Sequence, residues 1–175
     1  MPRSIPALLL PGAILLAAAP APAQQPSTPR CEAPAILPKG FESWQAPVPL
    51  AAAAGMADVA GAAIAPGVAA RLTLKANAAL QLAAPPGKPA TTDSFGGMVR
   101  FHVDRAGTWQ VALGGPAWLD LVQDGVATQS VAHSHGPDCT GIRKIVSYTL
   151  QPGDYVLQLV GSGTPEMTAL VLPVD

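Results

Sequence analysis

The sequence predicts an all-β protein: a single Greek-key or jelly-roll-like β-sandwich that follows an irregular N-terminal arm rich in proline and alanine. Two observations support this prediction. From residue 71 onward, apolar and polar residues alternate over short segments, which is the pattern of half-buried strands. Turn signals separate these segments at intervals of about 8 to 12 residues, with little helical periodicity between them, as is typical of sandwiches.

The first 23 residues have the three-part layout of a secretory signal peptide. Arg3 supplies the positive charge, the apolar run Ala7–Ala19 follows, and small residues precede the expected cleavage site after Ala23. The apolar run is shorter than the roughly 20 residues that a membrane-spanning helix needs. We therefore expect a cleaved signal peptide, no membrane span, and a periplasmic or secreted protein.

Removal of 23 of the 175 residues leaves 152, which is enough for one domain with a substantial core. We expect residues 24–65 to form the arm and residues 66–175 to form the sandwich. Without Arg3 the chain has 9 basic and 11 acidic side chains, a formal charge of −2. This balance argues against nucleic acid as a partner.

The arm has prolines throughout residues 24–50, which remove backbone donors and favour irregular, extended conformations. Phe41 and Trp44 within it indicate that the arm packs against another part of the protein. Residues 50–70 are rich in alanine and glycine and show neither a helical nor a strand period. A short helix is compatible with that composition.

Strands are expected in the apolar segments that follow, at residues 71–75, 99–103, 109–113, 118–122, 126–131, 145–150, 155–160 and 168–172. Trp109 and Trp118 have apolar neighbours and are expected in the core, although exposed tryptophans could form a platform for sugars. The segment Leu150–Tyr155, with Pro152 and Gly153 at its bend, resembles a tyrosine corner, in which a tyrosine hydroxyl hydrogen-bonds backward across a Greek-key corner.

The chain has two cysteines, Cys31 and Cys139. An oxidising compartment favours their pairing, and we expect a disulfide that closes a loop of over 100 residues. On the chain-entropy model such a disulfide contributes about 4 to 5 kcal/mol.

The stretch from about Gly96 to Val174 resembles the bacterial pre-peptidase C-terminal class of β-sandwich domains. The residues that carry the resemblance are Phe101–Val103, Ala106–Trp109, Trp118–Leu121 and Leu150–Tyr155. The resemblance implies an accessory module of an exported protein. The chain also looks like short exported bacterial proteins that are labelled homogentisate dioxygenase. That label implies a non-haem iron dioxygenase, whereas homogentisate dioxygenases themselves are larger proteins built on cupin barrels.

The densest group of ligand-capable residues is the segment 133–139. If it is extended, His133 and His135 project from one face and could bind one metal ion. Asp138 would complete a set of two histidines and one carboxylate for iron. Copper or zinc could instead take the two histidines and a reduced Cys139, which requires that the disulfide be absent. A cupin would have a glutamate four or five residues after His135, where this chain has Cys139 and Thr140.

Other interpretations of the same segment stay open. Residues 131–140 could be a solvated loop whose glycine, proline and aspartate form a turn. His102 and Asp104 could be a second ligand pair, or the polar outer face of an edge strand. Arg143 and Lys144 could contact an anionic ligand beside the imidazoles, or could end a strand in solvent.

We therefore expect a non-enzymatic exported sandwich that binds a small ligand or an envelope protein through residues 132–144. The first alternative is a metal-dependent oxidoreductase, a non-haem iron dioxygenase that uses His133, His135 and Asp138. The second is a purely structural envelope module.

Overall fold

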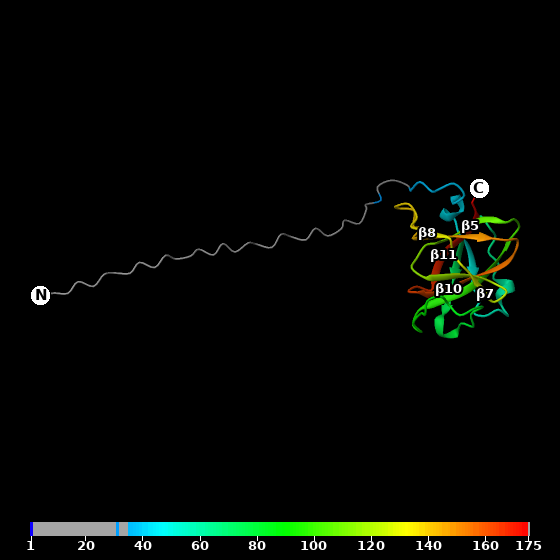
Figure 1. The fold of residues 1–175 in the computed structure, drawn as a ribbon, viewed down its shortest axis with the longest axis horizontal. Coiled ribbons are helices and arrows are strands. Elements are labelled where there is room, and N and C mark those ends of the chain that lie inside the picture. The colour runs from blue at the N-terminus through cyan, green and yellow to red at the C-terminus, as the bar shows by residue number, and fades with distance from the viewer. Residues whose placement is uncertain (2–30, 32–34, 175) are drawn as a thin grey trace.

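The computed structural model describes residue 1, residue 31 and residues 35–174. The predicted signal peptide therefore lies outside the described residues, apart from its first position. Figure 1 shows the described part as a compact set of strands. Within it, no helix has the length and apolar character needed to cross a membrane.

Two β-sheets form a sandwich, as the sequence predicts. The six-stranded sheet has the order β1 (Val48–Ala51), β2 (Ala70–Thr73), β11 (Glu166–Pro173), β5 (Gly107–Leu113), β9 (Lys144–Leu150) and β8 (Ala132–Ser134). The five-stranded sheet has the order β3 (Lys75–Ala76), β4 (Phe95–Val103), β10 (Gly153–Ser162), β6 (Trp118–Gln123) and β7 (Val126–Thr128). Only the pair β1–β2 is parallel among these strands. Three single-turn 3₁₀ helices complete the described elements: η1 (Glu42–Gln45), η2 (Val59–Gly61) and η3 (Asn77–Ala79).

The main core is formed by strand residues that alternate in and out of the sheets, as the period of two requires. Its aromatic centre is Phe101, whose ring lies 5.8 Å from that of Tyr155 and 6.3 Å from that of Trp109. The aliphatic side chains that are fully buried around it include Leu72, Leu113, Leu121, Leu150 and Leu157. Trp109 is in the core, as predicted.

The described part of the arm packs against the sandwich. Phe41 and Trp44 are buried in a second apolar cluster with Ile142, Ile145 and Leu170. Ile145 precedes Val146, which belongs to the main core, so β9 is covered on both faces. This double coverage explains the consecutive apolar residues of β9 and β11, and it confirms that the arm's aromatics pack against the domain.

The rest of the arm also belongs to the packed domain. Strand β1 joins the six-stranded sheet by pairing with β2. The alanine-rich stretch after it has no α-helix and only the short turn η2. It contributes Ala52, Ala53, Val59, Ala62 and Ile64 to the main core. Small side chains suit this role because the backbone of residue 52 approaches β4 closely: a Cβ on Gly97 would lie 2.6 Å from that of Ala52.

The predicted tyrosine corner is confirmed. The hydroxyl of Tyr155 donates to the carbonyl of Gln151 at 3.1 Å and accepts from the N–H of the same residue at 3.2 Å. Tyr155 is buried. The phenol therefore fixes the corner at which β9 turns into β10.

Two predictions need correction: the burial of Trp118 and the bounds of the strand expected at residues 126–131. Trp118 is not in the core, since 38% of it is exposed. The expected strand 126–131 ends at Thr128, and a separate edge strand, β8, follows at 132–134. Strands β1 and β3 were not predicted.

The disulfide between Cys31 and Cys139 is present, as expected, across 108 residues of sequence.

Candidate functional site

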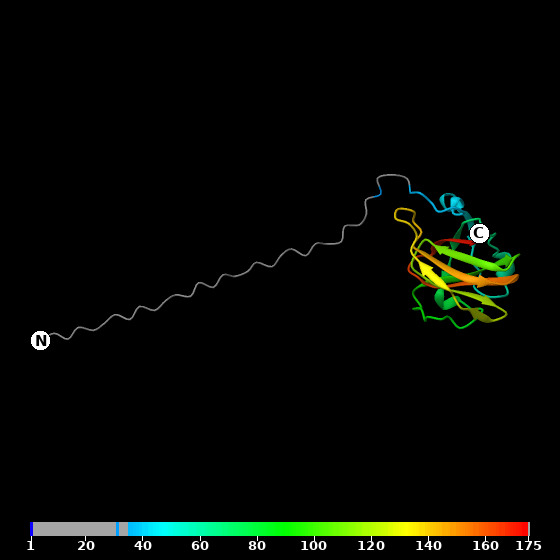
Figure 2. The ribbon, with the colours of Figure 1, turned by 45° about the horizontal axis from the view of Figure 1, so that its top comes forward.

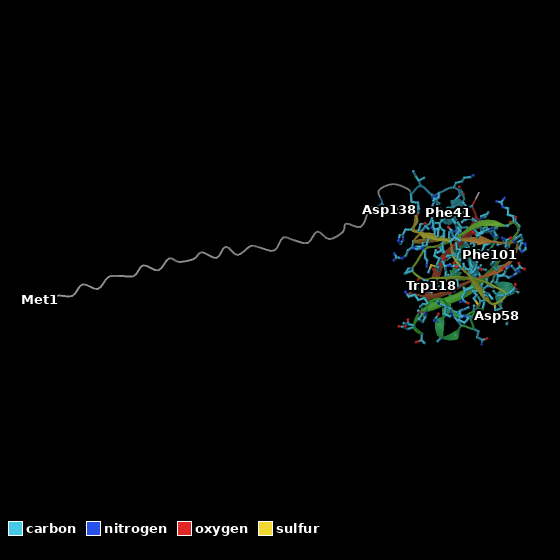
Figure 3. The ribbon with its side chains drawn as sticks, in the orientation of Figure 1. Met1, Phe41, Asp58, Phe101, Trp118 and Asp138 are labelled. Carbon is cyan, nitrogen blue, oxygen red and sulfur yellow. A yellow bond between two sulfur atoms is a disulfide. The ribbon has the colours of Figure 1, made fainter. Side chains whose placement is uncertain are left out.

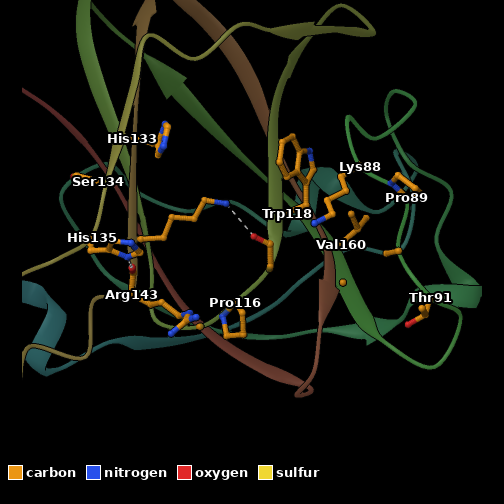
Figure 4. Close-up of a pocket in the computed structure, with 15 residues that line it drawn as sticks. Lys88, Pro89, Thr91, Pro116, Trp118, His133, Ser134, His135, Arg143 and Val160 are labelled. Atoms are coloured by element: carbon orange, nitrogen blue, oxygen red, sulfur yellow. Dashed lines mark hydrogen bonds between the residues drawn. The ribbon is translucent and has the colours of Figure 1, made fainter. Parts of the chain in front are cut away.

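A cavity of about 530 Å³ opens at the end of the sandwich where β6 and β9 begin and β10 ends. Its walls come from β8, from the starts of β6 and β9, and from the segments 88–91 and 115–117. Figure 4 shows His133 and His135 on one side of the opening and Trp118 and Lys88 on the other. Volumes of about 300 to 1,000 Å³ are usual for small-molecule sites.

The two histidines are positioned by edge strand β8 and the tight loop that follows it. His133 pairs with Val146 of β9 in the register of the sheet. The Nδ1 of His135 donates to the carbonyl of Arg143 at 2.9 Å. Because a carbonyl can only accept, Nδ1 carries the proton, and in the neutral ring Nε2 is left with a free lone pair.

The loop between His135 and Arg143 is closed by packing as well as by this hydrogen bond. Gly136 lies directly against Ile142, and a Cβ at this glycine would collide with the side chain and carbonyl of Ile142. The hydroxyl of Thr140 donates to the carbonyl of Pro137 at 2.7 Å and accepts from the N–H of Ile142 at 3.1 Å. The histidine segment is therefore ordered by specific contacts.

The disulfide joins the far end of this loop to the arm. Figures 1 and 2 both show the yellow loop that follows β8 beside the blue chain near residue 31. Cys139 and Gly141 both adopt left-handed backbone conformations, with φ of 64° and 73°. Such values are uncommon for a residue other than glycine, so the turn at Cys139 is tightly constrained.

Trp118 forms the wall opposite the histidines and is fixed by hydrogen bonding. Its indole Nε1 donates to Oδ1 of Asp120 at 2.9 Å, and the other carboxylate oxygen accepts from the N–H of Gly87 at 3.1 Å. A Cβ on Gly87 would lie 3.1 Å from the indole ring. The lack of a side chain at residue 87 thus lets the loop pack directly on the tryptophan.

The charge of the cavity is positive. Lys88, Arg143 and Lys144 line it, and within the described part of the chain no aspartate or glutamate does. Lys144 donates through Nζ to the carbonyl of Ala117 at 3.1 Å, the contact drawn in Figure 4, and its Nζ lies 5.5 Å from the centre of the Trp118 ring. Burial lowers the pKa of Lys144, the nearby charge of Asp120 partly offsets this effect, and the charge of Lys88 adds to the lowering.

A second cavity of about 450 Å³ adjoins the first, since Trp118, His133 and Lys144 line both. It lies between β6 and β9, and Tyr148 and Val146 form its inner wall. Burial raises the pKa of the Tyr148 phenol, with a smaller contribution from the charge of Asp120. The phenol therefore stays protonated at neutral pH and can donate a hydrogen bond.

Four of the residues singled out in the sequence come together here: His133, His135, Arg143 and Lys144 line the same cavity. His133 lies in β8, whereas His135 follows the end of that strand. Asp138 does not line this cavity; it lines a neighbouring depression that shares His135 and Arg143 with it. Figure 3 shows Asp138 and Trp118 on the same side of the domain.

The metal hypotheses receive no positive support from this geometry. Among the described residues, no three His, Cys, Asp or Glu side chains are grouped closely enough to hold a metal ion. Cys139 is held in the disulfide and is not a free thiolate. The iron site of His133, His135 and Asp138 remains a prediction.

His102 and Asp104 lie elsewhere, on and just after β4, two strands away from β6 in the sheet order. The Nδ1 of His102 is 2.9 Å from Oδ1 of Asp154, and both side chains are exposed. Strand β4 is paired with β10 along most of its length and with β3 at its start, so it is not an edge strand as one interpretation assumed.

Sequence reasoning missed Lys88 and Asp120 as parts of this site and assigned Trp118 to the core. The segment around Lys88 is proline-rich and shows no period that would place it, and only the fold brings it to the start of β6. One signal was available in the sequence: Trp118 and Asp120 are two residues apart in a strand. Residues with that spacing share a face of the sheet.

No model of a known protein family matches the chain, and no curated protein shows significant sequence similarity to it. The resemblances to pre-peptidase C-terminal domains and to proteins labelled homogentisate dioxygenase therefore remain predictions.

Proposed function

We propose that this protein is exported and acts as a non-enzymatic binding protein, taking up a small ligand in the cavity between Trp118 and the histidine segment. The observation that carries the proposal is the convergence of His133, His135, Arg143 and Lys144, from the segment predicted to bind, on one cavity of about 530 Å³. The cavity combines one exposed aromatic ring with several polar groups, which is the usual composition of a ligand site.

The rigidity of the surroundings supports a binding role. His135 is held by the carbonyl of Arg143, and Trp118 is held by Asp120. Lys144 is held by the carbonyl of Ala117. Groups that are fixed before the ligand arrives lose little conformational entropy on binding, so more of the contact energy appears as affinity.

The disulfide supports export. Disulfides persist in oxidising compartments such as the periplasm or the extracellular medium and are rare in the cytosol. Residues 31 and 139 are joined in this way, and the described part of the chain has no other cysteine. Localisation is tested by osmotic-shock fractionation and by mass spectrometry of the purified N-terminus, which should begin near residue 24.

Ligand binding is tested by NMR with ¹⁵N-labelled protein and a library of neutral, anionic and cationic fragments. We expect hits that shift the Trp118 indole signal and the amides of residues 133–135 and 143–144. Fragments that shift only signals far from the cavity, or a library without hits, would refute the proposal. Metal analysis of the same sample, purified without chelators, tests the iron alternative, which predicts near-stoichiometric iron that is lost in a His133→Ala, His135→Ala variant.

A pair of tryptophan substitutions provides a matched control. Ser134 is exposed on β8 and lines the cavity, so Ser134→Trp should obstruct it and weaken fragment binding. Thr149 is exposed on β9, in the same sheet, and does not line the cavity. Thr149→Trp should therefore leave the affinity unchanged.

A further inference from the structure

We infer that the ligand of this cavity is a small organic dianion that carries a flat ring, such as a phosphate monoester or a dicarboxylate; this inference rests on the proposed function and specifies its ligand. Three observations lead to it: the imbalance of charge at the cavity, the different elements from which the cations come, and the exposed face of Trp118.

The excess of positive charge at the cavity indicates how many negative charges the ligand carries. Lys88, Arg143 and Lys144 place three positive charges on the lining. The carboxylate of Asp120 accepts a hydrogen bond from the Trp118 indole, is 9% exposed and lines the adjoining cavity. It offsets one of the three charges. An excess of about two positive charges remains to be matched by a ligand.

The same imbalance is not a property of the chain as a whole. The chain has 10 basic and 11 acidic side chains and a formal charge of −1. Among the residues that the structure describes, three basic side chains line this cavity and no acidic one does. A local positive field on a nearly neutral protein attracts anions to that place instead of to the surface in general.

The positions of the cations favour one ligand that spans them. Arg143 and Lys144 precede and begin β9, while Lys88 comes from the loop that covers Trp118. Arg143 presents a planar guanidinium that can bind a phosphate or carboxylate with two parallel hydrogen bonds, and a lysine acts as a point charge. His135 lines the same cavity and adds an imidazole to these cationic side chains.

The ring is inferred from Trp118. This is the most exposed of the three tryptophans, because Trp44 and Trp109 are 7% and 2% exposed. It is held rigidly by Asp120 while 38% of it stays open to solvent. A fixed and exposed indole is suited to stacking on a flat group.

The test uses isothermal titration calorimetry and ¹⁵N NMR on the disulfide-bonded protein with five probes. Phenyl phosphate and phthalate are ring-bearing dianions, and they distinguish a phosphate ligand from a dicarboxylate ligand. Benzoate has the ring and one charge, benzyl alcohol has the ring and no charge, and inorganic phosphate has the charge and no ring. We expect phenyl phosphate or phthalate to bind at least fivefold more tightly than the other three probes.

Two matched pairs of variants test the residues. Arg143→Gln should weaken binding of the preferred dianion at least fivefold, whereas Arg71→Gln, which removes an exposed arginine from β2, should not. Lys88→Gln should weaken it less, because this side chain is exposed in a loop, and Lys75→Gln on β3 should have no effect. Trp118→Phe should retain the preference for ring-bearing probes and Trp118→Ala should lose it.

The outcomes separate the inference from the proposed function. If benzyl alcohol or benzoate binds in the cavity as tightly as both dianions, the inference is wrong and the cavity remains a ligand site. If no probe shifts the Trp118 indole, the inference is wrong, and the fragment library then decides whether the cavity binds any ligand. If Arg71→Gln weakens binding as much as Arg143→Gln, the charge acts through the whole protein and not through this cavity.

Discussion

Replacing both cysteines by serine gives a direct measure of how much the disulfide stabilises the fold. Cys31 and Cys139 are exposed, so serine leaves no cavity and no buried hydroxyl. They are separated by 108 residues. On the chain-entropy model, a loop of this size restricts the unfolded chain by about 5 kcal/mol at 25 °C. We therefore expect the Cys31→Ser, Cys139→Ser variant to lose most of that amount.

Urea denaturation followed by tryptophan fluorescence measures the free energy of unfolding of both proteins. The slope of that free energy against urea concentration should also rise in the variant, because an unfolded chain without the crosslink exposes more surface. Wild-type protein with the disulfide reduced should match the variant. A loss below about 1 kcal/mol would refute the argument, since the entropic effect of a loop this long would then be absent.

Three further predictions concern single residues. Tyr155→Phe removes both hydrogen bonds to Gln151, and urea denaturation should show a loss of about 1 to 2 kcal/mol; an unchanged midpoint would contradict a structural role for the corner. The raised pKa of Tyr148 means that the folded state keeps a proton that the unfolded chain loses above about pH 10. The stability that this phenol contributes is thus present below that pH and is lost above it, and thermal melts from pH 9 to 11 should show a smaller decline for Tyr148→Phe than for wild type. Gly136→Ala should destabilise the fold by about 1 to 3 kcal/mol, because the new methyl group collides with Ile142. Gly163→Ala is the control: its methyl group meets no atom within 4 Å, so the midpoint of thermal unfolding should change little. Equal effects of the two alanines would contradict the packing argument.

The strands of the sandwich were predictable where one face is buried and the other is exposed. In β4, Val99, Phe101 and Val103 are buried while Arg100 and His102 are exposed, so the alternation in the sequence follows the alternation of environment. The tyrosine corner was predictable because its proline, glycine and tyrosine act locally. Both signals come from residues that are adjacent in the chain.

The elements that sequence reasoning missed depend on contacts between distant segments. Strand β1 is short, follows Pro47 and contains Pro49, and these prolines disfavour a strand in isolation. It forms because β2 pairs with it over four residues. Strand β8 has no apolar alternation because all three of its residues are exposed, and it forms by pairing with β9. Local patterns carry no information about such partners.

The arm is the largest difference between the expected and the observed organisation, and it bears directly on the site. Trp44 lies beneath the histidine loop: its indole is 3.8 Å from where a Cβ on Gly141 would be and 3.5 Å from where one on Gly114 would be. Ile142, which closes the loop against Gly136, belongs to the same buried cluster as Phe41 and Trp44. The packing under the loop and the disulfide at its tip both come from the arm.

This arrangement explains how a short polar loop at the end of a sandwich can hold a preorganised site. The loop of seven residues between His135 and Arg143 has few apolar side chains of its own to fix it. The arm supplies a buried aromatic support on one side and a covalent link on the other, and the carbonyl of Arg143 then sets the orientation of the His135 ring. Ligand affinity should accordingly depend on arm residues that never touch the ligand, because loss of their support would transfer the entropy cost of ordering the loop to the binding step.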